Sequence, residues 1–307
     1  MPSPIQRTLQ RSVKCTGIGL HSGRLVAMAI RPAPADHGIV FVRADDGGRR
    51  VHARVENVLQ TRFATTLSEN GASVSTTEHI LSALYALEID NALIEVDGAE
   101  VPILDGSAAP FLLMLHEAGV QDLPALRRVL VIEEPVSVRE DGRSVSIEPA
   151  EQLDVTYAID FRHPVVPPQV FHGALDLRTF VEEIAPARTF CFLKDVEALR
   201  RQGLALGGSL DNAVVVGEHG VLNEALRFPD EFVRHKVLDL IGDLALAGMS
   251  IIGHVRAERA GHWLHTRLVK EILSQPRSWT LRAGVQSTLT SPAARPVSAG
   301  ASLAVAL

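Results

Sequence analysis

The sequence predicts an α+β fold of two similar domains, each a layer of helices packed on a β-sheet. Its 307 residues are enough for one large or two medium domains, and its 46 % hydrophobic residues supply a buried core. Strand-like segments followed by two helix-like segments occur once in each half of the chain. The segment Gly119–Arg128, which contains Pro124, reads as a linker between the halves.

The first predicted domain, residues 1–124, begins with short aliphatic runs that are typical of strands. Ile80, Leu81 and Leu84 have the spacing of one helix face. Ser75 and Glu78 have the spacing of a capping box at the start of that helix. In chain order we predict strands at Leu25–Ile30 and Ile39–Val42, a helix at about Thr76–Leu87, a strand at about Ala92–Val96 and a helix at about Ala108–Ala118.

The second predicted domain, residues 125–281, repeats this order and carries an inserted helix–turn–strand unit at about residues 190–216. Residues 282–307 are rich in Ala, Ser, Pro and Gly and are predicted to form a flexible tail. We predict strands at Arg128–Glu133, Ser144–Glu148 and Asp154–Ile159, helices at about Thr179–Glu183, Asp195–Gln202 and Glu231–Ala247, a strand at Ser250–Arg256 and a helix at His262–Leu273.

Composition excludes several classes of function. A net charge of −6 argues against a broad nucleic-acid surface, which needs a basic face. Met1–Pro4 does not begin a signal peptide, and the longest apolar stretch, Val237–Ile252, contains two aspartates and is no membrane span. With only Cys15 and Cys191, a disulfide framework is not expected and a reducing cytoplasm is predicted. A metal site would therefore use histidine and carboxylate ligands.

The strongest chemical signal lies in the helix predicted at Glu231–Ala247. His235, Asp239 and Asp243 are spaced four residues apart and share one face of a helix that is otherwise aliphatic. A histidine and an aspartate one turn apart can hold one cation at ~2.0–2.2 Å. The simpler alternative is an ion pair between these side chains on a solvated face.

Two further segments carry candidate catalytic residues. In Ser75–His79, Glu78 can act as a general base beside a metal ligand, His79; alternatively, Glu78 only caps the helix and His79 packs beside it. In the third segment, Gly261 precedes His262 and permits a close approach to a cleft, but His262 can equally be a surface residue at a helix terminus.

Taken together, these segments resemble the UDP-3-O-acyl-N-acetylglucosamine deacetylase family of lipid A synthesis. The resemblance extends from about Gln6 to Leu273 and is carried by eight segments in the same order. They are Thr16–Gly23, Ser75–Ile80, Ile89–Asn91, Val101–Ser107, Asp160–Pro164, Ala187–Phe190, Phe232–Asp239 and Ser250–His254. The resemblance implies two similar domains with the active site between them.

The resemblance also implies a role for each matched residue. The zinc ligands would be His79, His235 and Asp239, although Fe²⁺ in place of zinc in the cell is left open. Glu78 and His262 would be the acid–base pair, supported by Lys236, Thr189 and Asp243. The residues that match the family's substrate-binding positions or line the predicted cleft are His21 near the sugar, Asp160 and Phe161 near uridine, the cationic Arg143 and Arg259, and Phe190, Phe192 and Gly261. Cys191 stands where the family often has glycine.

The function implied is hydrolysis of an N-acetyl group, which yields acetate and a free 2-amine on a sugar nucleotide that still carries its ester-linked acyl chain. The implied partner is this acylated UDP-sugar, with peripheral membrane contact allowed, and the family suggests a monomer. A non-haem iron oxygenase and a structural metal-binding module are the alternatives, since two histidines and a carboxylate serve iron as well as zinc.

The predicted insert supplies a candidate shelter for the acyl chain. The segment 190–216 has more aliphatic and aromatic residues than a short helix and turn need, and Gly203, Gly207 and Gly208 permit sharp bends. We expect its apolar side to line a passage leading from the metal, with Arg200 and Arg201 facing water. The alternative is a plain helix packed on the sheet.

Overall fold

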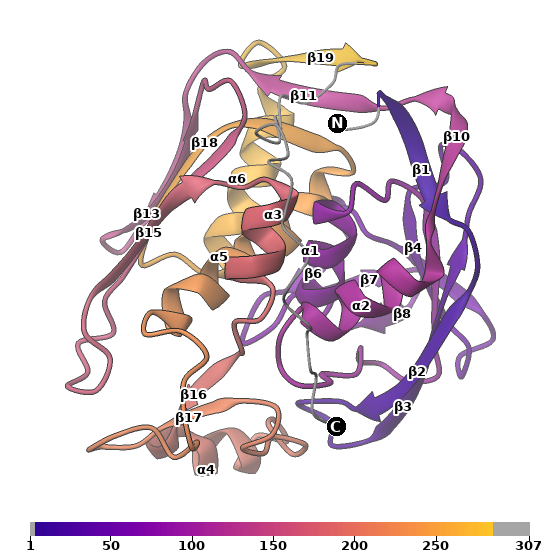
Figure 1. Cartoon of the computed structure of the whole chain (residues 1–307). Coiled ribbons are helices and arrows are strands. Elements are labelled where there is room, and N and C mark those ends of the chain that lie inside the picture. The colour runs from indigo at the N-terminus through magenta and orange to yellow at the C-terminus, as the bar shows by residue number, and fades with distance from the viewer. Residues whose placement is uncertain (1–3, 285–307) are drawn as a thin grey trace, which may run out of the picture.

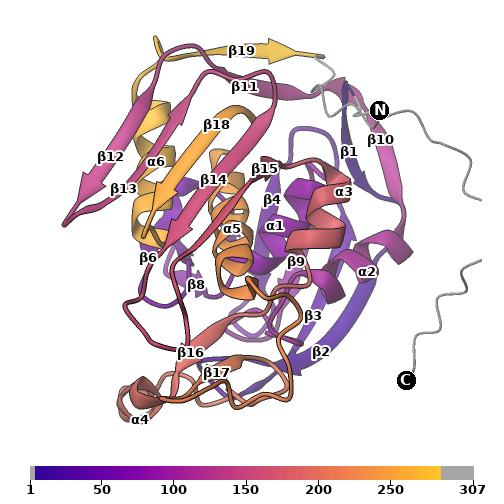
Figure 2. The same ribbon diagram turned by 60° about the vertical axis from the view of Figure 1, so that its left-hand side comes forward.

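Two β-sheets enclose a layer of helices in the computed structural model, which describes residues 4–284 (Figure 1). Figure 2 shows the same order from a second direction, with the helices α1, α2, α5 and α6 between the sheets. The predicted α+β class is confirmed. The predicted tail lies outside the described residues from residue 285 onward.

The N-terminal half contains a five-stranded sheet in the order β2-β3-β9-β4-β5 and a three-stranded sheet β6-β7-β8. In β9 the burial alternates along the strand, so one face of the larger sheet packs against the core. The elements of this half are β1 (Ile5–Leu9), β2 (Val13–Ile18), β3 (Leu25–Pro32), β4 (Ile39–Arg43), β5 (Arg49–His52), η1 (Val55–Asn57), β6 (Val58–Gln60), β7 (Thr66–Glu69), β8 (Ala72–Val74), α1 (Glu78–Ala86), β9 (Ala92–Val96) and α2 (Ala109–Ala118).

The C-terminal half contains a seven-stranded sheet, in which β18 pairs with β13, β11 and β14. Strand β14 alternates strictly between buried and half-buried residues, as expected for a strand with one face on the core. The elements are β10 (Val120–Leu126), β11 (Arg128–Ile132), β12 (Val136–Glu140), β13 (Arg143–Glu148), β14 (Leu153–Ile159), β15 (Gln169–Ala174), α3 (Leu177–Thr179), η2 (Phe180–Ile184), β16 (Phe190–Phe192), α4 (Leu193–Arg201), β17 (Val214–Val216), α5 (Glu231–Leu244), η3 (Ala245–Ala247), β18 (Ser250–Glu258), α6 (His262–Ser274) and β19 (Trp279–Ala283).

The two halves share one hydrophobic core, and helices α1 and α5 cross at its centre. A Cβ atom on Gly242 of α5 would lie 2.1 Å from the carbonyl oxygen of Glu78 on α1. Only glycine therefore allows the two backbones to approach this closely. This contact sets the first turn of α1 against the middle of α5.

The structure departs from the sequence-based expectations at the junction of the halves. The predicted linker is wrong as a local assignment, because residues 120–126 form β10, which pairs with β1 from the start of the chain. Pro124 is tolerated there because the pair has no third strand that would require its missing N–H. The boundary between residues 124 and 125 stays a prediction.

The other departures concern short elements. Strand β16 begins the insert, which is therefore a strand–helix–strand unit in which β16 and β17 pair in parallel. The helix predicted at Thr179–Glu183 is the short α3 followed by one wider turn, η2. Within residues 4–284, no helix has the length and apolar character needed to cross a membrane.

Candidate metal and catalytic site

Helices from both halves bring together the three predicted metal ligands. His79 lies in the first turn of α1, while His235 and Asp239 lie one turn apart on α5. The Asp239 Oδ1 atom is 3.3 Å from His235 Nε2 and 3.8 Å from His79 Nε2. All three side chains are buried, and their ligand atoms lie within 4.8 Å of one another.

The polar atoms of this cluster have the pattern of a cation site. His235 Nδ1 lies 3.1 Å from the Ala187 carbonyl, to which it can donate, so its Nε2 presents a lone pair to Asp239. The Oδ1 atom of Asp239 is buried and has no hydrogen-bond partner among the described residues. Burial lowers the pKa of His79 to about 3, so this imidazole is neutral at pH 7, as a metal ligand must be. Buried lone pairs that face one another without a proton are stabilised by a cation.

Lys236 contacts the same carboxylate. Its Nζ donates to Asp239 Oδ2 at 2.6 Å, which leaves Oδ1 as the oxygen that faces the two histidines. Burial alone would favour a neutral Asp239, but neighbouring positive charge, including that of Lys236, lowers its pKa and keeps it ionised. Lys236 thus orients a proposed ligand and places a positive charge beside its Oδ2 atom.

Glu78 and His262 face each other beside the proposed ligands. Glu78 Oε1 is 3.8 Å from His262 Nε2, and Glu78 Oε2 accepts a hydrogen bond from Thr65 N at 3.0 Å. His262 Nε2 is also 3.8 Å from Asp239 Oδ2. Burial raises the pKa of Glu78 to about 7, close to the pH at which a general base must exchange a proton.

Asp243 controls the protonation of His262. Its Oδ2 lies 2.7 Å from His262 Nδ1 at the start of α6, where Gly261 is the residue before the helix. Burial opposes the positive charge of His262, but Asp243 and Asp239 outweigh it and raise the pKa of His262 to about 9. His262 is therefore protonated at pH 7 and can act as an acid through Nε2.

Three residues of this network were missed in the sequence. Thr65 donates to Asp243 Oδ1 at 2.6 Å, and His265 Nδ1 lies 2.9 Å from Asp243 Oδ2. The Tyr157 hydroxyl lies 2.9 Å from His265 Nε2, so the chain of hydrogen bonds continues into β14. The position of His265, one turn after His262, was a usable signal, whereas no pattern marks Thr65 or Tyr157.

The predicted aromatic residues gather beside the predicted metal ligands. The ring of Phe161 lies 5.4 Å from that of Phe190 and 5.6 Å from that of Phe192. The Phe190 ring is 6.2 Å from the His235 ring, which links this aromatic group to the cluster on α5. Asp160 is exposed, and its side chain accepts from the Arg162 backbone at 2.9 Å.

The two predicted arginines lie together at the β12–β13 turn. Arg143 forms an exposed ion pair with Glu140 at 3.1 Å, and the Arg259 guanidinium donates to the Gly142 carbonyl. No contact between either arginine and the His79 cluster is found among the described residues. Their role in binding a diphosphate stays a prediction.

An apolar cavity of about 330 Å³ adjoins this site. Thr189 and Phe190 line it, as does His21, whose buried Nε2 has no partner among the described residues. The rest of the cavity wall includes residues of the insert, such as Ala205 and Ser209. Arg200, which we expected to face only water, is exposed but also lines this cavity.

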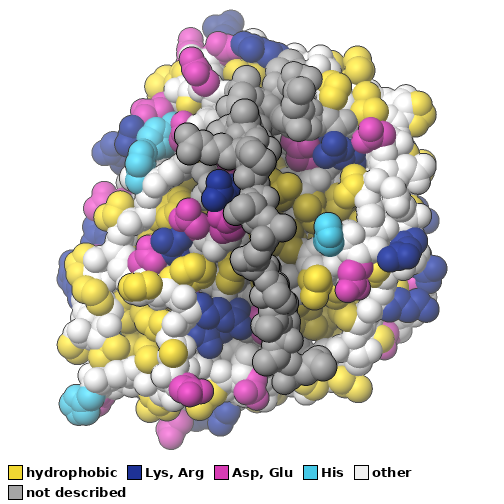
Figure 3. Space-filling view, in the orientation of Figure 1, with side chains coloured by type: hydrophobic (Ala, Val, Ile, Leu, Met, Phe, Trp, Pro, Cys, Tyr) yellow, Lys and Arg dark blue, Asp and Glu magenta, His cyan; other side chains and the backbone are white. Residues whose placement is uncertain are grey.

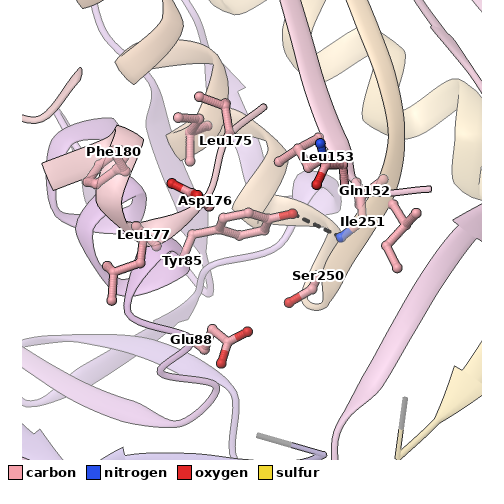
Figure 4. Close-up of a pocket in the computed structure, with 13 residues that line it drawn as sticks. Tyr85, Glu88, Gln152, Leu153, Leu175, Asp176, Leu177, Phe180, Ser250 and Ile251 are labelled. Carbon is pink, nitrogen blue, oxygen red and sulfur yellow. Dashed lines mark hydrogen bonds between the residues drawn. The ribbon is translucent and has the colours of Figure 1, made fainter. Parts of the chain in front are cut away.

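A separate cavity, beside Tyr85, is a poor candidate for substrate. Figure 4 shows the Tyr85 hydroxyl, which accepts a hydrogen bond from Ile251 N at 2.9 Å, among mainly apolar side chains. This cavity has a volume of about 50 Å³ and includes no residue of the His79 cluster. A single water occupies ~30 Å³ of liquid, so there is no room for a sugar nucleotide.

Charged side chains of both signs are spread over one face of the molecule (Figure 3). On the part of the face in Figure 3 that grey atoms leave visible, acidic and basic side chains are interspersed among hydrophobic ones. This pattern fits the net charge of −6. A nucleic-acid surface would instead present clustered Lys and Arg.

Comparisons with known proteins place the chain among one group of enzymes. A model of the family described as UDP-3-O-acyl N-acetylglycosamine deacetylase matches residues 6–274. A protein of Anaeromyxobacter dehalogenans (strain 2CP-C), named UDP-3-O-acyl-N-acetylglucosamine deacetylase, is 50 % identical over 277 residues, which cover 90 % of each chain. A protein with that name from Anaeromyxobacter sp. (strain Fw109-5) is 48 % identical, and the match covers 96 % of this chain and 97 % of the relative. A protein with that name from Myxococcus xanthus (strain DK1622) is also 48 % identical, and the match covers 90 % of this chain and 88 % of the relative.

Proposed function

The chain belongs to the UDP-3-O-acyl N-acetylglycosamine deacetylase family, and from this premise we propose that it removes the N-acetyl group of UDP-3-O-acyl-N-acetylglucosamine in a zinc-dependent reaction. The observation that carries the proposal is the buried set of His79, His235 and Asp239. Their potential ligand atoms lie within 4.8 Å of one another, and Asp239 Oδ1 has no hydrogen-bond partner among the described residues. Such a reaction is an early committed step of lipid A synthesis. We assign it to the cytoplasm, in keeping with the free thiols of Cys15 and Cys191.

The chain's own groups are suited to hydrolysis of an amide. His79, His235 and Asp239 would hold a zinc ion, and such an ion would supply a water whose pKa is lowered toward ~7. Glu78 takes a proton from the attacking water, whose oxygen forms a bond to the acetyl carbonyl carbon. Thr189 lies at the cavity wall, where it can donate to the developing oxyanion. The C–N bond then breaks as protonated His262 gives its proton to the leaving amine, so the products are acetate and the free 2-amine.

The acid–base pair favours hydrolysis over the alternative of iron-dependent oxygenation. An oxygenase triad needs open positions for oxygen but has no use for a carboxylate base and an imidazolium acid facing each other. Glu78 and His262 have that arrangement. Burial raises the pKa of Glu78 and so favours its neutral form, whereas Asp243 helps to raise the pKa of His262 against the effect of burial and so favours its charged form. We therefore retain hydrolysis as the reaction class.

A deacetylation assay with and without metal tests this proposal. The purified protein is expected to release acetate from an acylated UDP-N-acetylglucosamine, to lose this activity after chelation and dialysis, and to regain it with Zn²⁺. A mock-dialysed sample is the control, and Fe²⁺ addition compares the two metals. Failure of the metal-loaded protein to release acetate would contradict the activity, and full activity without metal would contradict the metal requirement.

We further propose that the 330 Å³ cavity shelters the substrate's acyl chain. Apart from Arg200, the insert side of this cavity is mostly apolar and includes Leu193, Val196 and Leu199. Burial of each methylene is worth about 0.8 kcal/mol, so a long chain contributes much of the binding free energy. His21 at the cavity is then positioned near the sugar. Asp160 and Phe161 are assigned to uridine, and Arg143 and Arg259 to the diphosphate.

Narrowing this cavity is expected to penalise long acyl chains selectively. Ser209→Trp fills part of the cavity and should lower the kcat/KM ratio of long-chain to short-chain substrate by roughly tenfold, the loss of about two buried methylenes. Ala205→Trp should act in the same direction, but Ala205 already has a φ of 52°, so Ser209→Trp is the cleaner variant. Gln202→Trp, at an exposed position of the same insert, is the control. An unchanged ratio in folded Ser209→Trp and Ala205→Trp proteins would mean that the chain binds elsewhere.

A further inference from the structure

The carboxylate of Glu100 is hydrogen-bonded to two other segments of the chain, one at His21 and Ser22 and the other at Thr76. Glu100 is 3 % exposed and immediately precedes the segment Val101–Ser107. Its Oε1 accepts from the His21 backbone at 2.7 Å, and its Oε2 accepts from the Ser22 backbone at 2.8 Å. The Thr76 hydroxyl donates to Oε1 at 3.1 Å. Three donors thus converge on one buried carboxylate, a pattern that makes each bond strong.

The first of these segments is the turn at residues 19–24, which forms one side of the acyl cavity. Gly23 N donates to Gly19 O at 3.0 Å, and Gly19 N donates to Arg24 O at 2.9 Å, so the turn is closed on itself. A Cβ atom on Gly19 would lie 2.5 Å from Glu100 Oε2, which means that the carboxylate packs directly on the turn. Glu100 therefore fixes where Leu20 and His21 stand at the cavity wall.

The same turn holds the insert in place. Leu206 N donates to His21 O at 3.2 Å, and Gly207 N donates to Leu20 O at 3.0 Å. A Cβ atom on Gly207 would lie 2.3 Å from Gly19 O, so the two backbones are in contact. The width of the cavity is set where the turn from one half meets the insert from the other.

The second of these segments leads into the proposed metal site. Thr76 has a φ of 58°, a conformation that is unfavourable for a β-branched residue. Its hydroxyl is held by Glu100, and Glu78 and His79 follow two and three residues later. Ser75 also bridges to Glu100 through the backbone, since Val101 N donates to Ser75 O at 3.0 Å. One carboxylate thus connects the cavity wall with the start of α1.

We propose that Glu100 is a positioning residue. It fixes the position of the acyl cavity relative to the metal site, and it thereby sets the enzyme's selectivity for acyl-chain length. This inference rests on the proposed deacetylase function. Glu100 acts through the turn at residues 19–24 and does not line the cavity itself. Its carboxylate must accept from three donors, and an amide of the same size cannot, because its NH₂ group would face a donor.

The test compares Glu100→Gln with Glu95→Gln. The second variant makes the same chemical change at a half-exposed glutamate of β9, which is paired with Arg31. Glu100→Gln is expected to lower the long-chain to short-chain ratio of kcat/KM by roughly tenfold, mainly through KM, because a buried charge-assisted interaction is lost. Bound zinc should stay stoichiometric. Hydrogen exchange should quicken in peptides that cover residues 19–24 and 203–209, whereas Glu95→Gln should alter neither measurement.

Other outcomes separate the possible failures. A folded Glu100→Gln protein with the wild-type ratio and wild-type exchange would overturn the inference, as would a lower melting temperature alone, which marks a purely structural role. If Glu100→Gln does not fold, the same measurements are made on Gly207→Ala, because its methyl group displaces the insert from the same turn. A wild-type ratio of kcat/KM for long-chain to short-chain substrate in Gly207→Ala would also overturn the inference. Absence of deacetylation by the wild-type protein would instead refute the proposed function, while the exchange measurement still tests the contact.

Discussion

Replacement of His235 by alanine is expected to remove most of the bound zinc and to reduce deacetylation to background. His79→Ala and Asp239→Ala should behave alike, because each removes one of three ligands that converge on a buried point. Loss of one neutral imidazole also leaves Asp239 Oδ1 buried without the cation that we propose to compensate it. The measurement is metal content per protein by elemental analysis, together with initial rates.

His172→Ala is the matched control, since His172 is exposed on β15 and belongs to no cluster of potential metal ligands among the described residues. It should retain full metal content and activity. Stoichiometric zinc in the His235→Ala protein would eliminate the ligand assignment. A loss of zinc with unaltered turnover would eliminate the role of the metal in catalysis.

Glu78→Gln is expected to keep zinc but to lose ~10²–10⁴-fold in turnover, the usual contribution of a positioned general base. The amide is nearly isosteric, and its oxygen can still accept from Thr65 N, so the fold of this region should be retained. His262→Ala should lose a similar factor because the leaving amine then lacks its proton donor. Circular dichroism and metal analysis check that each variant is folded and loaded.

The pH dependence gives a second measure of the same pair. Glu78 must be deprotonated and its pKa is about 7, so activity should rise as the pH increases toward that value; a bound cation would move this limb lower. His262 must be protonated and its pKa is about 9, so activity should fall as the pH rises through about 9. His262→Ala should flatten the alkaline limb, and wild-type turnover from pH 6 to 9 in that variant would exclude the general-acid role.

The part of the site that was predictable from the sequence is the part that depends on helical periodicity. His235, Asp239 and Asp243 share one face of α5 because a helix places residues four apart on the same side, whatever surrounds it. The start of α6 at His262, after Gly261, was likewise indicated locally. The predicted capping box at Ser75 and Glu78 is wrong, because α1 begins at Glu78 after Thr77 and no side chain caps its first turn. Family resemblance then joined these separate helices, and the comparisons confirm that resemblance.

Strand pairing over long separations was not predictable in the same way. Residues 120–126 looked like a linker, yet they pair with β1, more than 100 positions earlier in the chain. Strand β10 has no buried residue and lacks the continuous apolar pattern that marks a buried strand. Their existence depends on the partner strand, which local sequence does not identify.

The sequence by itself determined the fold class, the helices that bear the proposed ligands and the family. The tertiary structure alone decided that Thr65 and His265 share Asp243 with His262, and that Glu100 joins the turn at residues 19–24 to the start of α1. The physical reason is that side-chain spacing along a helix is fixed by local backbone geometry, whereas contacts between distant segments are fixed by packing. At this site, that packing includes the close crossing of α1 and α5 at Gly242.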